Sequence, residues 1–93
     1  MRRQLLPSKP FEREVRRHLK KHPGSEGHLQ ATLRALADDA FQPSLQTHKL
    51  KGDLDGYWAA SAGYDLRIVF KLIQQGGVEA IVLSAIGTHD DVY

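Results

Sequence analysis

Histidines, carboxylates and basic side chains recur in the second half of the 93-residue chain, where their types could support acid–base chemistry. One such group can take the proton from a ribose 2′-hydroxyl, and a second can protonate the leaving 5′ oxygen, while cations hold the phosphate. Each positioned proton transfer is worth roughly 10²–10⁴ in rate. Two histidines together with cations therefore have the chemical groups that cleavage of RNA requires. The residues of this set are His48, Lys49, Lys51, Asp65, Arg67, His89, Asp90 and Asp91.

A metal site is the competing chemistry for some of the same residues. His89 with Asp90 or Asp91, together with His48, offers ligands that divalent ions accept. Adjacent residues of an extended segment point to opposite sides, however, so the last three side chains do not meet easily at one ion. No HExxH or similar spacing occurs, and the chain has no cysteine. We therefore predict neither a metal nor another cofactor, and we interpret Asp90 and Asp91 as solvated charges.

Positive charge is concentrated at the start of the chain. Residues 1–22 hold eight lysines and arginines against two glutamates, a net charge of +6, whereas the remainder holds five against nine, a net charge of −4. Such asymmetry favours a surface that attracts a polyanion or an acidic protein, although a solvated helix face has the same composition. We interpret three histidines on or beside this basic segment and its partner helix as surface residues: His18, His22 and His28.

The elements that must position these residues begin with a predicted helical hairpin. Residues 2–8 form a candidate first strand, and Ser8 is a predicted N-cap for a basic helix with a narrow apolar stripe. The His-Pro-Gly segment at 22–24 ends that helix. Ser25 is predicted to cap a second helix that ends near Ala40, and the short link between the helices predicts an antiparallel pair.

The second half of the chain has the pattern of β structure. Residues 57–62, 64–73 and 78–87 are predicted strands, and the last is apolar on both faces, as a central strand would be. The Gly-rich segment 74–77 is a predicted hairpin turn, and residues 48–51 form a short extended piece. The order β-α-α-β-β-β predicts an α+β fold, in which the helical hairpin packs on a mainly antiparallel four-stranded sheet.

Length and composition also bound the setting in which the chain works. Ninety-three residues predict a single domain over residues 1–93. No stretch approaches the ~20 apolar residues of a membrane helix, and no charged-then-apolar leader starts the chain. The absence of cysteine suits a reducing compartment. We therefore expect a cytoplasmic protein without a membrane partner.

Three pieces of the sequence resemble one protein family in order and spacing: HKLKG at 48–52, GYW at 56–58 and the closing GTHDDVY at 87–93. The chain resembles the RelE/ParE superfamily of bacterial type II toxins, and within it the YafQ-like, ribosome-dependent mRNA interferases. The resemblance covers nearly the whole chain and implies a RelE-like fold. It also implies an endoribonuclease that cleaves mRNA on the ribosome and is masked by a cognate antitoxin, with operator DNA bound only through that antitoxin.

The resemblance implies roles for individual residues. His48 or Asp65 would act as the general base, and His89 would act as the general acid. Tyr93 would stack on a base or hold the tail. The family's phosphate-clamping arginine is missing here, and we expect Arg67, Lys49 and Lys51 to supply the clamp in its place. The basic N-terminal helix would contact ribosomal RNA, and its candidate residues are Arg13, Arg16 and Arg17.

The sequence also departs from the family pattern at three positions. A family histidine falls on Ser61, a family arginine falls on Ala85, and a frequent tryptophan falls on Leu66. Arg67 follows Asp65 by two residues in a predicted strand, so both are expected on one face, where a compensating cation is needed. Two alternatives therefore stay open: a non-enzymatic gyrase inhibitor of the ParE kind, and a weakened homologue that serves as an antitoxin-binding module.

Overall fold

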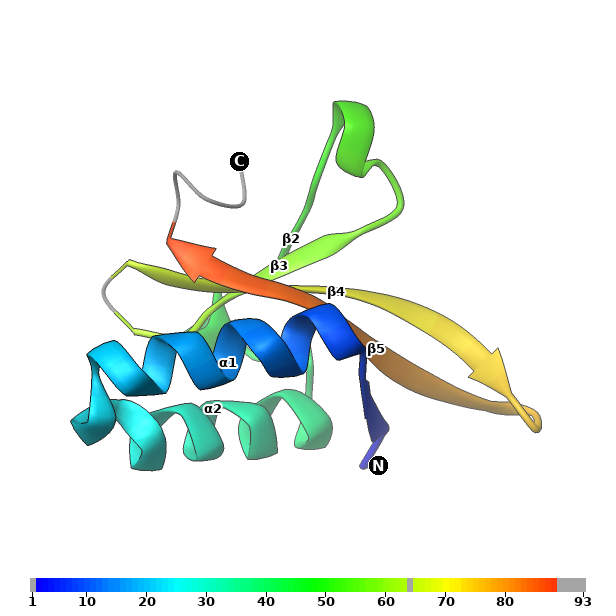
Figure 1. Ribbon diagram of the computed structural model, residues 1–93. Helices are drawn as coiled ribbons and strands as arrows, with labels where there is room; N and C mark the ends of the chain where they lie inside the picture. The colour runs from blue at the N-terminus through cyan, green and yellow to red at the C-terminus, as the bar shows by residue number, and fades with distance from the viewer. Residues whose placement is uncertain (1, 64, 89–93) are drawn as a thin grey trace.

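Two helices and five strands make up the part of the chain that the structure, a computed structural model, describes: residues 2–63 and 65–88 (Figure 1). Three short 3₁₀ helices lie in the connections, at Pro23–Ser25, Pro43–Leu45 and Gly52–Leu54. The main elements follow in the order β1 (Gln4–Pro7), α1 (Lys9–Lys21), α2 (Glu26–Asp38), β2 (His48–Lys49), β3 (Trp58–Ser61), β4 (Leu66–Gln75) and β5 (Val78–Thr88).

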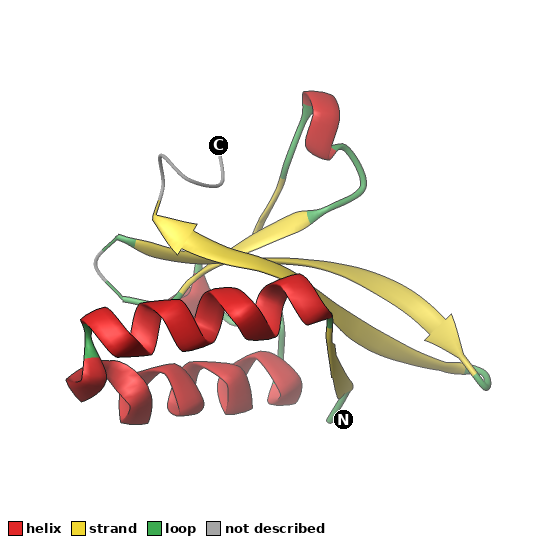
Figure 2. Ribbon diagram, in the orientation of Figure 1, coloured by secondary structure: helices red, strands yellow, loops and turns green. Residues whose placement is uncertain are grey.

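The strands form one sheet in the order β1-β5-β4-β3-β2, in which β1 is parallel to β5 and the other neighbours are antiparallel. Both helices pack on the same face of this sheet (Figure 2). The predicted α+β class is confirmed, but the sheet has five strands rather than four. The additional strand, β2, is only two residues long, which is too short for a period of two to appear in the sequence.

The helical hairpin is antiparallel, as predicted (Figure 1). Ser8 caps α1, since its hydroxyl oxygen accepts a hydrogen bond from the Phe11 N–H at 3.2 Å. Ser25 occupies the predicted N-cap position of α2, but it does not cap the helix through its side chain. Its side chain makes no cap bond to the helix and instead donates to the His22 carbonyl at 2.7 Å, which closes the 3₁₀ helix between α1 and α2. Within residues 2–63 and 65–88, neither helix is long and apolar enough to cross a membrane.

The main core lies between the helices and the sheet. Alternate residues of β4 and β5 point toward the helices, so that the strands contribute Ile68, Phe70, Ile81 and Leu83, and the helices contribute Phe11, Leu29 and Leu36. A second, smaller cluster lies on the opposite face of the sheet. We call it the small cluster; its members are Leu50, Ala59 and Val69, with Leu54, Tyr57 and Ala85 packed against them.

The β4–β5 hairpin sets which side chains reach each face. Gly76 and Gly77, with φ of 61° and 81°, form the two-residue turn that the Gly-Gly pair predicts. A β-bulge interrupts the ladder, because Phe70 pairs with Leu83 whereas Val69 pairs with Ala85. The extra residue in β5 is Ser84. Beyond it, each residue of β5 again points to the same face of the sheet as its partner in β4.

Candidate functional site

The face of the sheet without helices, hereafter the helix-free face, is organised in rows of cross-strand partners. One row is polar or small and consists of Ser61, Arg67 and Gly87. The adjacent row consists of His48, Ala59, Val69 and Ala85. Since Val69 and Ala59 belong to the small cluster, both rows lie on the side away from the helices.

His48 and Arg67 therefore project to the same side of the sheet. Two strand spacings of ~4.8 Å and one two-residue step of ~6.8 Å put their Cα atoms roughly 12 Å apart. The His48 Nδ1 atom is 3.1 Å from the carbonyl oxygen of Gln46, a residue with a left-handed φ of 50°. Arg67 is half-buried, and its Nη1 donates to the Leu66 carbonyl at 3.2 Å.

Lys49 and Lys51 do not join this pair directly. Lys49 follows His48 in the extended strand β2 and so points to the opposite side, where it pairs with Trp58. Its ammonium nitrogen lies 5.5 Å from the centroid of the Trp58 ring, a cation–π distance. Lys51 is exposed in the connection that follows β2. Of the three predicted clamp residues, the structure thus places Arg67 alone on the helix-free face of a strand.

Asp65 precedes β4 instead of belonging to it. The strand begins at Leu66, and Asp65 is an exposed residue of the β3–β4 connection. The expectation that Asp65 and Arg67 share a strand face is therefore wrong, because the alternation rule applies only inside the strand. Asp65 nevertheless lies two residues from Arg67 in the sequence, at the same end of the sheet.

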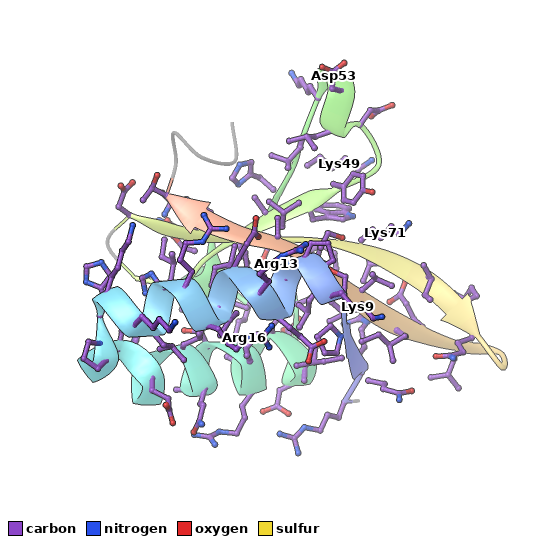
Figure 3. All side chains as sticks on the ribbon, in the orientation of Figure 1. Lys9, Arg13, Arg16, Lys49, Asp53 and Lys71 are labelled. Carbon is purple, nitrogen blue, oxygen red and sulfur yellow. The ribbon has the colours of Figure 1, made fainter. Side chains whose placement is uncertain are left out.

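Lys71 is a cation of the helix-free face that the sequence interpretation did not select. It lies two steps beyond Val69 in β4, on the same side as Arg67. Its ammonium nitrogen is 5.7 Å from the ring centroid of Tyr57, which packs on the small cluster. The signal was present in the alternation of Arg67, Val69 and Lys71. Figure 3 shows Lys71 projecting from β4.

Two departures from the family pattern fall inside this site. Ser61 is the direct partner of Arg67, and its hydroxyl lies 3.5 Å from the amide oxygen of Gln46. Ala85 is the direct partner of Val69 and packs on the small cluster. An arginine at position 85 would therefore project from the centre of the helix-free face.

The three candidate arginines of α1 lie on the other side of the sheet. Arg13, Arg16 and Arg17 are all exposed, and Figure 3 shows Arg13 and Arg16 on α1, which packs against the opposite face from the small cluster. The candidate residues thus separate into a strand group and a helix group. The two groups come near each other at the end of the sheet where β5 finishes. Arg17 lines a cleft there with Gly87 and Thr88, and Gly87 is also the cross-strand partner of Arg67.

The remaining two candidates, His89 and Tyr93, lie outside the described residues. The last described residue, Thr88, pairs with Leu66 at the start of β4. Across residues 2–63 and 65–88, no group of three or more histidine, cysteine, aspartate or glutamate side chains is arranged to hold a metal ion.

Comparison with solved structures places this architecture among bacterial toxins. YafQ from E. coli superposes with a TM-score of 0.78 at 18% identity, covering 98% of each chain. The YoeB/ParE toxin from Agrobacterium tumefaciens gives 0.75 at 16% identity, covering 92% of this chain and 98% of the other. A chain of the E. coli DinJ–YafQ toxin–antitoxin complex gives 0.75 at 19% identity, covering 100% and 99%. These likenesses establish a shared fold.

The sequence itself establishes the family. A comparison with curated proteins finds no significant match. The family described as "Bacterial toxin of type II toxin-antitoxin system, YafQ" matches residues 3–93, which is almost the entire chain. The chain therefore belongs to the YafQ family of bacterial type II toxins.

Proposed function

We propose that this chain is a ribosome-dependent endoribonuclease of the cytoplasm that cleaves mRNA. The observation that carries the proposal is the helix-free face, on which His48 and Arg67 project to the same side in a chain of the YafQ family. A cognate antitoxin would mask the chain, as the DinJ–YafQ pairing suggests, and operator DNA would be bound only through that antitoxin.

The proposed reaction is an internal transesterification of RNA. His48 or Asp65 takes the proton from a ribose 2′-hydroxyl, whose oxygen then attacks the adjacent phosphorus. The bond from phosphorus to the 5′ oxygen breaks, and His89 donates a proton to that leaving oxygen. The products are a 2′,3′-cyclic phosphate and a free 5′-hydroxyl, so that protons and bonds balance without a metal or an added reactant.

Arg67 would stabilise the negative charge that develops on the phosphate oxygens. A half-buried guanidinium at a fixed position is less screened than a fully solvated one, so its interaction with the transition state is stronger. Lys71 would add a second positive charge further along the same face of β4. Lys51 and the exposed arginines of α1 would contribute affinity for the RNA backbone, with Tyr93 stacking on a base.

The decisive experiment removes the proposed acid. His89→Ala should lower cleavage of ribosome-bound mRNA by roughly 10²–10⁴ and abolish growth inhibition, because the leaving oxygen loses its proton donor. His28→Ala is the matched control, since His28 is an exposed histidine of α2. Cleavage is read by primer extension on programmed ribosomes, and folding by circular dichroism. A fully toxic His89→Ala chain would refute the acid assignment.

A weakened homologue is the second candidate, because Ser61 and Ala85 stand in the site where the family carries polar groups. Expression without an antitoxin is the first test, and a harmless chain favours this reading. Ala85→Arg should then restore cleavage, since the long side chain can lie along the small cluster and reach the phosphate. Gyrase supercoiling, measured in parallel, identifies the non-enzymatic alternative if it is inhibited while mRNA stays intact.

A further inference from the structure

A polar cleft of about 470 Å³ lies between the second half of α1 and the ends of β4 and β5. The helix supplies every charged or titratable side chain that lines it among the described residues, and the strands supply none. The lining residues are Glu14, Arg17, His18, Lys21 and His22 from α1 and its C-cap, Leu66 from β4, and Ile86, Gly87 and Thr88 from β5.

The charges of this cleft favour an anion over a cation. Arg17 and Lys21 carry positive charge near neutral pH, and the imidazoles of His18 and His22 lie beside them in the lining. Glu14 is the one acid among the described lining residues, and its carboxylate is already engaged. Its Oε1 accepts a hydrogen bond from the Ile86 N–H at 3.0 Å.

The two histidines of the cleft are coupled. Their rings are in contact but tilted, with centroids 4.9 Å apart and an angle of 38° between the planes. Burial lowers the pKa of His18, and the charge on His22 lowers it further. Both effects oppose a second positive charge in an empty cleft. A bound phosphate anion opposes both effects, because its negative charge favours the protonated rings.

The cleft is continuous with the helix-free face around the edge of the sheet. Gly87 lines the cleft and is also the direct partner of Arg67. β1 pairs with β5 only from Ala80 to Leu83, so beyond Leu83 no described strand covers the outer edge of β5. An extended polymer can therefore pass around this edge from one face to the other.

We propose that the cleft is a phosphate-binding subsite whose affinity rises as the pH falls, and that it takes a backbone phosphate of the RNA strand that leaves the helix-free face around the edge of β5. The RNA part of this assignment rests on the proposed function, whereas the phosphate part rests on the cleft alone. Arg17 and Lys21 supply permanent charge. His18 and His22 supply imidazole N–H donors, and protonation of His18 adds positive charge as the pH falls.

Binding of a non-cleavable RNA tests the subsite separately from catalysis. A 2′-O-methyl RNA oligonucleotide lacks the nucleophile, so its affinity for the full chain, read by fluorescence anisotropy, does not depend on cleavage. Lys21→Gln should weaken binding roughly fivefold and lower the salt slope by about 0.7. Lys20→Gln is the matched control, because it removes the same charge from an exposed position outside the lining. Equal losses in the two variants would reduce the cleft to diffuse helix charge and overturn the proposal.

Substitution of Glu14 and substitution of the two histidines should change the affinity for RNA in opposite directions. Glu14→Gln keeps an oxygen acceptor for the Ile86 N–H but removes the negative charge, so RNA should bind more tightly. The wild-type chain should bind more tightly at about pH 5.5 than at about pH 7.5, and the double variant His18→Gln/His22→Gln should lose the part of that difference that the cleft supplies. His28→Gln should retain the full difference. An unchanged pH dependence in the double variant contradicts the role of the two histidines.

Inorganic phosphate distinguishes the source of the ligand. Added phosphate should shift the His18 and His22 imidazole signals in NMR spectra and should compete with the oligonucleotide at this cleft. Phosphate binding without competition would make the site one for a free anion and overturn the RNA assignment. No shift with either ligand would overturn the subsite itself. Neither result depends on whether His89→Ala abolishes cleavage, so failure of the subsite and failure of the proposed function remain distinguishable.

Discussion

The two faces of the sheet use the same strands for different purposes. On the helix-covered face, Ile68 and Phe70 are fully buried in an apolar core. On the helix-free face, the intervening residues Arg67 and Lys71 present cations on either side of buried Val69. Neighbouring positions of β4 therefore contribute to stability and to the candidate chemistry in alternation. Substitutions one residue apart should have separable effects on folding and on activity.

The largest expected effect is a loss of stability when the apolar core on the helix-covered face is disrupted. Phe70→Ala removes a fully buried aromatic ring and should lower the free energy of unfolding by about 3–5 kcal/mol, because the cavity cannot collapse completely. Urea denaturation followed by circular dichroism measures the change. A loss below about 1 kcal/mol would show that this face does not hold the main core.

The next effect comes from the helix-free face and should appear in activity. Arg67→Gln should lower mRNA cleavage on the ribosome by roughly 10²-fold, since it removes the guanidinium proposed to stabilise the transition state. The free energy of unfolding should change by no more than about 0.5 kcal/mol, because among residues 2–63 and 65–88 Arg67 forms no ion pair and is not a member of the main core. Arg67→Lys keeps the charge without the planar fork and should fall between the two. Equal activity in all three chains would remove Arg67 from the mechanism.

The smallest expected effect concerns helix α1 on the covered face, and it appears as a change in how the free energy of unfolding depends on pH. The pKa of His18 is lowered from 6.5, chiefly by burial, so the folded chain resists protonation that the unfolded chain accepts. This difference contributes to the free energy of unfolding. The contribution is fully present above the pKa of the unfolded chain and is lost as the pH falls through the lowered pKa of the folded chain. His18→Gln should therefore make the decline in unfolding free energy on acidification shallower. Denaturation midpoints at several pH values measure it, and parallel curves for the two chains would contradict the assignment.

Much of the fold follows from the sequence because its signals are local. The apolar stripe of the first helix, the Ser8 cap and the glycine turn each depend on signals within a few residues, and the structure contains all three, with the turn shortened from 74–77 to Gly76–Gly77. The alternation in β4 also identified the two faces correctly from Leu66 onward. Local chemistry thus determined the helical hairpin, the long β-hairpin and the α+β class.

Features that depend on distant partners could not be predicted in the same way. The pairing of β2 with β3 needs only two residues, and the bulge at Ser84 is visible only through its partners in β4. Asp65 was assigned to a strand because the end of a ladder has no local marker. His22 and His28 are exposed, as interpreted, whereas His18 is half-buried, because the strand ends that complete its cleft come from residues far along the chain.

The hydrogen bond from Ile86 to Glu14 has a consequence for how molecules of this chain avoid one another. Beyond Leu83, no described strand pairs with the outer edge of β5, and unpaired strand edges can recruit strands from other chains. Glu14 of α1 accepts the Ile86 N–H, so that donor is not available to an incoming strand. A strand from a second copy or from another polypeptide would have to displace this carboxylate to pair there. The contact that docks α1 on β5 thus also opposes edge-to-edge pairing.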